Sequence, residues 1–288
     1  MVVEELDLAL TAGTTHCLVG ESGCGKSLTC LTLMGLLPAG ARRVAGLEVD
    51  GVVQPARRRG PAPAAADLSG RDRLARPLMT VGQQIAECAA RRRRARRREA
   101  EELIAQVGIA KPRERYDSYP HEFSGGMNQR IAIAMALAGR PKALLADEPT
   151  TALDVTIQAQ ILDLLLDLQA ETGLALLFVT HDLGIVMQIG DSVSVMYCGR
   201  IVEHGLASEL LIRPQHPYTR DLMACRPTLI DADRRLASIP GSVPPIGARP
   251  ASCSFEPRCR RAIERCRTDR PDLRGGHRGD AVACFNPL

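Results

Sequence analysis

Hydrophobic positions follow two patterns between Thr15 and about Val202, short continuous runs and runs at helical spacing. Short continuous apolar runs bounded by polar residues are typical of buried strands, and longer segments with apolar residues at helical spacing are typical of helices. The predicted strands are 15–19, 142–146, 174–180, 192–198 and 199–203, and the predicted helices are 27–37, 131–138 and 157–170. The alternation of the two patterns predicts an α/β domain with a largely parallel sheet.

Three segments depart from this alternation. Residues 52–76 are rich in Pro, Ala and Arg and lack periodicity, so we expect a poorly ordered loop. The arginine run 91–98 lies on a predicted helix; a solvated helix face is preferred over a nucleic-acid site, because no base-stacking residues lie nearby. After about Gly205, frequent prolines predict a small, loop-rich appendix.

The composition excludes a membrane-spanning chain. The sequence has 288 residues, 45% of them hydrophobic and 24% charged, with a net charge of +4. No segment approaches the ~18 consecutive apolar residues of a membrane span. The acidic start MVVEELDL lacks a signal-peptide pattern, so we expect a cytosolic chain that reaches a membrane only through a partner.

The segment GESGCGKS fits the pattern G-x-x-x-x-G-K-[ST] of a phosphate-binding P-loop. Its residues are Gly20, Glu21, Ser22, Gly23, Cys24, Gly25, Lys26 and Ser27. Glycines let backbone N–H groups point at phosphate oxygens, and the following helix adds positive potential. Lys26 would reach the β- and γ-phosphates, and the Ser27 hydroxyl would ligate Mg²⁺. A glycine-rich turn could match by chance, but the strand before and the helix after favour the phosphate site.

Three further groups follow predicted strands or begin a helix. Asp147 after a buried strand can hold Mg²⁺, and Glu148 can orient or deprotonate the attacking water. Ser124, Gly125 and Gly126 begin a predicted helix and form a second anion-binding nest. One nucleotide does not need two such nests from one chain, which suggests that each chain completes its neighbour's site. His181 ends the strand 174–180, where a γ-phosphate would lie.

The motifs GESGCGKS, FSGGMNQR, LLADEPTTALD and VTHD resemble the Walker A, signature, Walker B with D-loop, and H-loop motifs of ABC-transporter ATPase subunits. The segments PQHPYTRDLM and IPGSVPPIGARPASCSFEPRC are similar to those of dipeptide and oligopeptide importers, a group that includes nickel importers. The resemblance implies a P-loop NTPase fold of ABC type: a RecA-like core plus a helical subdomain. It places an ATPase domain at 1–206 and a Cys- and Pro-rich C-terminal region at 207–288.

The resemblance also implies roles for individual residues. Lys26, Glu148 and His181 would be catalytic, and Ser27 and Asp147 would support Mg²⁺. The residues of 20–27 would bind ATP. Ser124, Gly125 and Gly126 would bind ATP held by the partner subunit, and Asp154 would act in the D-loop across that interface.

The implied partners are a second ATPase subunit, identical or different, two transmembrane permease subunits and an extracytoplasmic substrate-binding protein, with no nucleic acid. The chain would lie at the cytoplasmic face of the cell membrane as a peripheral protein. It departs from the family in two ways: residues 1–13 hold no aromatic to stack on adenine, and no glutamine lies where a Q-loop is expected, ahead of Met79. Alternatives are therefore an ATPase for nickel or another solute, and a catalytically weakened partner subunit.

Four cysteines lie close together near the end of the chain. Cys253, Cys259, Cys266 and Cys284 have the spacing C-x5-C-x6-C-x17-C. In a cytosolic protein, such a cluster favours metal binding over disulfides. Zinc and iron–sulfur both accept four thiolates, although structural zinc sites usually show closer pairs. The family resemblance favours a [4Fe–4S] cluster, and zinc or metal-free cysteines remain alternatives. Distance in sequence from Glu148 suggests a structural role.

Overall fold

The computed structural model describes residues 2–37, 47–49, 52–54, 65–67, 76–89, 93–151, 153–225, 238–275 and 279–288. The chain forms two compact units. The first unit comprises Met1–Ala9, Thr15–Thr29 and Phe178–Leu288, and the second comprises Leu10–Thr14 and Cys30–Leu177. The two units interleave along the chain.

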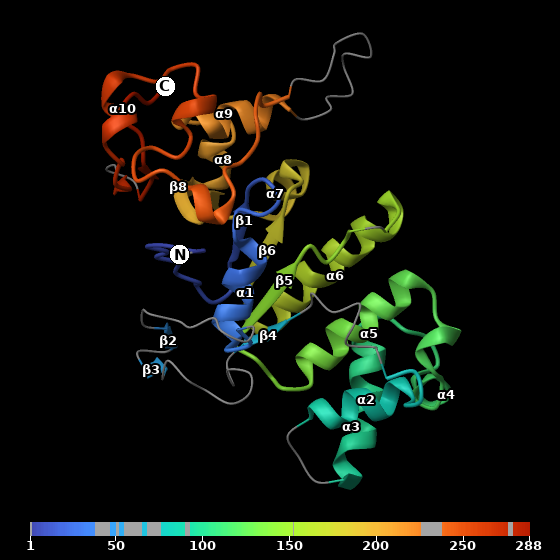
Figure 1. Ribbon diagram of the computed structural model, residues 1–288. Helices are drawn as coiled ribbons and strands as arrows, with labels where there is room; N and C mark the ends of the chain where they lie inside the picture. Colours follow the sequence, from blue (N-terminus) through green and yellow to red (C-terminus); the bar gives the residue numbers. More distant parts are fainter. Residues whose placement is uncertain are drawn as a thin grey trace. The chain divides into compact units, whose positions relative to one another are not determined.

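The first unit is built on a mixed sheet (Figure 1). Its strands are β1 (Thr15–Val19), β7 (Ser192–Tyr197), β8 (Arg200–Leu206), β9 (Arg274–Gly275) and β10 (Ala281–Val282). Strand β1 pairs in parallel with β7, with His16 opposite Ser192, whereas β7 with β8, β8 with β10 and β10 with β9 are antiparallel. All five residues of β1 are buried, as expected for an interior strand.

The strands β7 and β8 are joined by a tight hairpin. Cys198 and Gly199 form the turn, and both have positive φ angles, 48° and 85°. A two-residue turn of this kind matches the right-handed twist of the flanking strands. The C-terminal strand β10 adds to the free edge of β8, so the appendix extends the sheet of the first unit.

Short helices complete the first unit. They are α7 (Leu183–Ile189), α8 (Ala207–Leu210), α9 (Pro217–Ala224), α10 (Glu264–Thr268) and the 3₁₀ turns Ile246–Ala248 and Glu256–Arg258. Helix α1 (Lys26–Met34) begins in this unit directly after the P-loop.

The second unit combines strands with a group of helices (Figure 1). Its strands are β2 (Leu47–Val49), β3 (Val52–Gln54), β4 (Ala65–Asp67), β5 (Ala143–Asp147) and the first half of β6 (Ala175–Thr180). Its helices are α2 (Val81–Cys88), α3 (Arg93–Gln106), α4 (Pro112–Tyr116), α5 (Gly125–Leu137) and α6 (Val155–Thr172). Helices α2 to α5 pack together as the helical part of the unit.

Local sequence explains where several of these helices begin and end. Thr80 caps α2 with a capping box completed by Gln83, and Asp154 caps α6 by accepting from the N–H of Ile157. Helix α6 ends at Thr172 and is capped by Gly173, whose φ of 69° is the left-handed conformation that glycine adopts readily. A Cβ on Gly82 would lie 2.1 Å from the Tyr116 ring, so this glycine lets α4 approach α2.

The predicted α/β fold is confirmed, with local corrections. The predicted helix 27–37, which was expected to stop at Pro38, is α1, and α1 ends three residues earlier, at Met34. Within the predicted loop 52–76, residues 52–54 and 65–67 are strands, because β3 pairs with β2 and β4 pairs with β5. Residues 55–64 and 68–75 lie outside the described residues. The arginine run lies on α3 from Arg93, and Arg91 and Arg92 lie outside the described part.

Within the described residues, no helix is both long and apolar enough to cross a bilayer.

Candidate functional site

The P-loop connects the buried strand β1 to α1 in the first unit. Its three glycines, Gly20, Gly23 and Gly25, have φ angles of 154°, 78° and 115°. Residues with a Cβ rarely adopt such angles. At Gly20 a Cβ would also lie 2.2 Å from the backbone oxygen of Met196. The glycines predicted from the motif are therefore required by the backbone itself.

Lys26 is buried and its ammonium group lies inside the loop. Its Nζ donates to the backbone oxygens of Gly20 at 2.8 Å and Glu21 at 3.1 Å. It also lies 3.7 Å from the Cys24 sulfur. Burial raises the pKa of the Cys24 thiol, and the positive charge of Lys26 opposes that rise. Ser27, the predicted Mg²⁺ ligand, is exposed at the start of α1.

Two residues of the C-terminal region contact the P-loop at Glu21. The Tyr218 hydroxyl accepts from the backbone N–H of Glu21 at 2.9 Å. The Arg258 guanidinium donates to both Glu21 carboxylate oxygens at 3.0 to 3.2 Å. Sequence reasoning missed both residues, although each lies in a segment that carries the family resemblance. No spacing rule connects them to a loop 197 and 237 positions away.

An aromatic cluster lies directly beneath this contact. Tyr197, Tyr218 and Phe255 are each at most 2% exposed, and their ring centroids lie 4.7 to 5.3 Å apart. Edge-to-face and tilted arrangements at such separations are the favourable ones. The cluster joins β7, α9 and the segment before Cys259 into one core.

His181 directly follows β6 in the first unit and is exposed. The next residue, Asp182, caps α7 by accepting from the N–H of Gly184 at 2.7 Å. The structure therefore places His181 at a strand end, as predicted, on the short connection to α7.

Asp147 and Glu148 lie at the end of β5 in the second unit. Asp147 is the last residue of the strand, and its Oδ1 is buried. Glu148 has a φ of 48°, in the left-handed region that costs a non-glycine residue about 1–2 kcal/mol. Its carboxylate accepts from the Thr151 hydroxyl at 3.0 Å. Strain held at one carboxylate beside a strand end is a common feature of functional sites.

The signature residues begin α5 in the same unit. Ser124 caps the helix by accepting from the N–H of Met127 at 3.4 Å, and both Ser124 and Gly125 are exposed. A Cβ on Gly126 would lie 2.5 Å from Ile157 Cγ2, and one on Gly125 would lie 3.9 Å from Leu153. The start of α5 therefore lies beside the start of α6, where Asp154 is the cap. The structure brings the signature and D-loop residues together.

No glutamine of the described segment before α2 matches the expected Q-loop. Gln83 and Gln84 lie inside α2, where Gln84 donates to the backbone oxygens of Met79 and Arg76. Gln54 ends β3.

The four C-terminal cysteines are free thiols, and Cys253, Cys259 and Cys284 each interact electrostatically with Cys266. The Cys253 N–H donates to the Cys266 oxygen at 3.2 Å. Burial, together with the neighbouring Cys266 and Cys259, raises the pKa of Cys253 to about 11. Burial followed by the other cysteines also raises the pKa values of Cys259 and Cys284. Among the described residues, no group of three or more His, Cys, Asp or Glu side chains is arranged to hold a metal ion.

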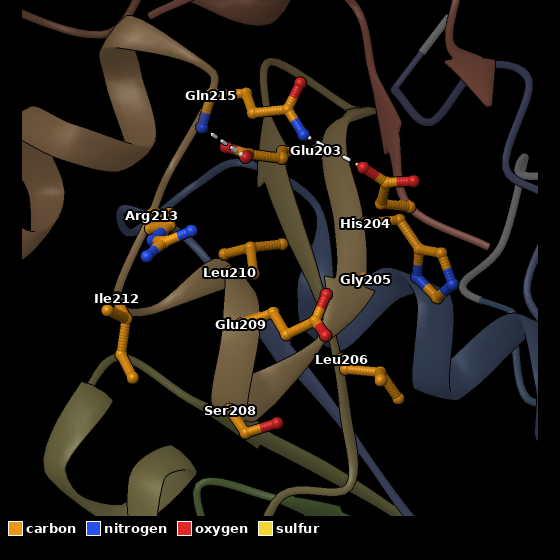
Figure 2. A pocket seen from close by; sticks show the side chains of 11 residues that line it. Glu203, His204, Gly205, Leu206, Ser208, Glu209, Leu210, Ile212, Arg213 and Gln215 are labelled. Carbon is orange, nitrogen blue, oxygen red and sulfur yellow. Dashed lines mark hydrogen bonds between the residues drawn. The ribbon is translucent and has the colours of Figure 1, made fainter. Parts of the chain in front are cut away.

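A separate cavity of about 390 Å³ is lined by β8, α8, the segment 212–215 and Asp280 (Figure 2). It contains none of the predicted site residues. Glu203 on its wall accepts from the backbone N–H groups of Gln215 at 2.6 Å and His216 at 3.0 Å. Gln215 also donates to Asp280 at 3.0 Å. Because its carboxylate is engaged by the backbone, Glu203 serves to position the segment that carries Tyr218.

Solved structures with a similar fold are ATP-binding cassettes. The dimeric post-hydrolysis state of MJ0796 bound to ADP and Pi matches with a TM-score of 0.60 and 23% identity, covering 72% of this chain and 90% of that one. The cbiO1 protein of Clostridium perfringens, part of the ABC transporter complex cbiONQ, matches with a TM-score of 0.61 and 25% identity, covering 73% and 84%. Fold and P-loop together define an ATP-binding cassette.

Sequence comparison identifies the family. The ABC transporter family model matches residues 3–151, and the model of the oligopeptide/dipeptide transporter C-terminal region matches residues 202–266. The dipeptide transport ATP-binding protein DppD of Escherichia coli is 42% identical over 99% of this chain and 91% of its own length. The oligopeptide transport ATP-binding protein AppD of Bacillus subtilis is 38% identical over 98% and 90%. The chain therefore belongs to the ABC transporter family, as an ATPase subunit.

Proposed function

We propose that this chain hydrolyses ATP to drive import of dipeptides or oligopeptides through a membrane permease. The observation that carries the ATPase role is the P-loop, with three glycines at positive φ around the buried Lys26. The relatives named for dipeptide and oligopeptide transport support the peptide substrate. Residues 1–206 would form the nucleotide-binding domain, and residues 207–288 the C-terminal region.

Each predicted residue takes one step of the reaction. Backbone N–H groups of 20–27 bind the phosphates, and Lys26 neutralises the charge that develops on them. Ser27 and Asp147 would hold Mg²⁺, which would offset the negative charge of the phosphates. Glu148 orients the attacking water and accepts its proton, and His181 contacts the γ-phosphate. The left-handed backbone of Glu148 supports this role, because it fixes the direction in which the side chain leaves the main chain.

A second ATPase subunit would complete each site. Ser124, Gly125 and Gly126 offer helix N-terminal N–H groups on an exposed surface, which suits phosphates held by a neighbouring chain. Asp154 lies beside them at the start of α6 and would act across the same interface. Two permease subunits, an extracytoplasmic binding protein and a place at the cytoplasmic membrane face follow from the importer role.

Two alternatives depart from peptide import. The ATPase chain would not contact the solute. Import of nickel or another solute would therefore use the same ATP-binding and hydrolysing residues as peptide import. A weakened subunit is favoured by one observation, the absence of a glutamine at the Q-loop position, and is opposed by the presence of Glu148 and His181.

The ATPase assignment is tested with two variants. Glu148→Gln should bind ATP normally and lose most turnover, because the amide cannot accept the proton. Lys26→Ala should weaken ATP binding itself. Glu102→Gln, on a side chain 66% exposed, is the matched control. Wild-type hydrolysis by Glu148→Gln, purified with its partner subunits, would remove Glu148 from the mechanism.

For the C-terminal cysteines we propose a [4Fe–4S] cluster held by Cys253, Cys259, Cys266 and Cys284. The sequence clustering of the four cysteines supports the proposal, as does a segment with few apolar residues, for which a metal centre would act as a core. Anaerobic purification should yield brown protein with about four irons per chain, lost in Cys259→Ser. Colourless protein containing zinc or no metal would contradict it.

A further inference from the structure

Glu21 is the residue through which the C-terminal region reaches the phosphate loop. The Tyr218 hydroxyl holds its backbone N–H, and Arg258 holds both oxygens of its carboxylate. A guanidinium that engages both oxygens fixes the orientation of the carboxylate as well as its position. The first residue after Gly20 is therefore fixed at main chain and side chain by a segment distant in sequence.

Burial makes the Arg258 contact strong. The Arg258 side chain is only 5% exposed, and that of Glu21 is 26% exposed. Exposed ion pairs contribute little to stability, but removing one partner of a buried pair leaves an uncompensated charge. Arg258 also donates to the Pro240 oxygen at 2.8 Å and to the Tyr197 hydroxyl at 3.3 Å. These additional bonds fix the guanidinium in one position.

Tyr218 is held equally firmly. The N–H of Tyr218 donates to His216 Nδ1 at 3.0 Å, and the N–H of His216 donates to Glu203. Glu203 also accepts from Gln215, as Figure 2 shows. The ring of Tyr218 packs on Phe255, which lies three residues before Arg258. Both contacts to Glu21 therefore come from one core.

We propose that Arg258 and Tyr218 are positioning residues that hold the P-loop in its nucleotide-binding conformation. The affinity for ATP then depends on a C-terminal region folded against the loop. This proposal rests on the proposed ATPase function and deepens it. The Tyr218 hydroxyl accepts from the N–H of Glu21, which lies before the N–H groups at the start of α1. Arg258 directly precedes Cys259. A conformational change in the cysteine segment would therefore move Arg258 and alter its contact with Glu21.

The test measures the Kd for ATP with Mg²⁺ on the full chain, and KM and kcat for hydrolysis with its partner subunits. Arg258→Ala should raise the Kd about tenfold, the effect of one charge-assisted hydrogen bond. Tyr218→Phe removes only the hydroxyl and should raise the Kd roughly threefold. In both variants KM should rise while kcat at saturating ATP is retained. Arg267→Ala is the matched control, because this tail arginine is 63% exposed and pairs with Glu256 and Glu264 rather than with the P-loop.

A double-mutant cycle isolates the pair. Glu21→Gln combined with Arg258→Ala should bind ATP no worse than Arg258→Ala alone. Unchanged Kd and KM in both Arg258→Ala and Tyr218→Phe would overturn the proposal, as would a fall in kcat alone. If Arg258→Ala does not fold, Tyr218→Phe decides the question. If Lys26→Ala also binds ATP like the wild type, the nucleotide site itself is wrongly assigned; loss of binding in Lys26→Ala confines the failure to the positioning role.

Discussion

The stability of the strand that leads into the P-loop should depend on pH through His16. This residue on β1 is 3% exposed. Its ring hydrogen-bonds with Ser192 Oγ at 2.8 Å and Ser194 Oγ at 3.0 Å, and it stacks on His204 at 5.6 Å. Burial, reinforced by His204, lowers the pKa of His16 from 6.5 to about 4.

The sign and size of the effect follow from linkage. At neutral pH, His16 is uncharged in both the folded and the unfolded chain. As the pH falls below 6.5, the unfolded chain takes up a proton that the folded chain excludes until about pH 4, so stability is lost within this window. Each pKa unit corresponds to about 1.4 kcal/mol, so lowering the pH to 5 should reduce the free energy of unfolding by ~2 kcal/mol through His16 alone. Burial also lowers the pKa of His216 to about 4, so His216 should contribute a similar loss.

Urea unfolding of the wild type and of His16→Gln at pH 7 and pH 5 tests this reasoning. Carboxylates and His216 titrate in both proteins, so the difference between their pH dependences isolates His16. The variant should be less stable at pH 7, because it loses packing, but it should lose ~2 kcal/mol less between the two pH values. His121→Gln, at an exposed histidine, serves as the control. Equal pH dependence of His16→Gln and the wild type would refute the argument.

Three further substitutions test the fold around the site. Gly20→Ala should destabilise the chain by several kcal/mol and abolish ATP binding, measured by urea unfolding and titration, because its Cβ would meet the Met196 oxygen at 2.2 Å. Gly82→Ala should separate α2 from Tyr116 and lower the melting temperature without changing the Kd for ATP, since its Cβ would lie 2.1 Å from that ring. Glu203→Gln should cost about 2 kcal/mol in urea unfolding at pH 7, because its amide would turn a donor toward a backbone N–H. Burial raises the pKa of Glu203 above its usual value of 4.5. As the pH rises from 4.5 through the raised pKa of the folded state, the wild type should therefore lose stability, and Glu203→Gln should lack this loss.

The phosphate loop could be predicted because its chemistry is local. Gly20, Gly23 and Gly25 are required by their own backbone angles, and the strand and helix on either side show clear periodicity. Asp147 was likewise predictable as the end of a continuous apolar run. The left-handed backbone of Glu148 was not, because only the surrounding structure forces a non-glycine residue into that conformation.

Other features depend on pairing between distant segments. Ala65–Asp67 has the composition of a loop, yet it forms β4 because β5 offers it a parallel edge. Propensity is a weak guide for so short a strand. The contacts of Tyr218 and Arg258 with Glu21 are similarly invisible in sequence, because side chains so far apart follow no periodicity. Although the cysteine segment is distant in sequence from the P-loop, Arg258, the residue before Cys259, contacts that loop at Glu21.

The aromatic cluster gives this protein an unusual optical property. The chain has four tyrosines and no tryptophan, so its intrinsic fluorescence comes from tyrosine alone. Two of the four emitters, Tyr197 and Tyr218, lie in the buried cluster, and the hydroxyl of Tyr218 is bonded to Glu21. Nucleotide that alters the loop should therefore change the emission of an unlabelled chain, and Tyr218→Phe should remove most of that signal.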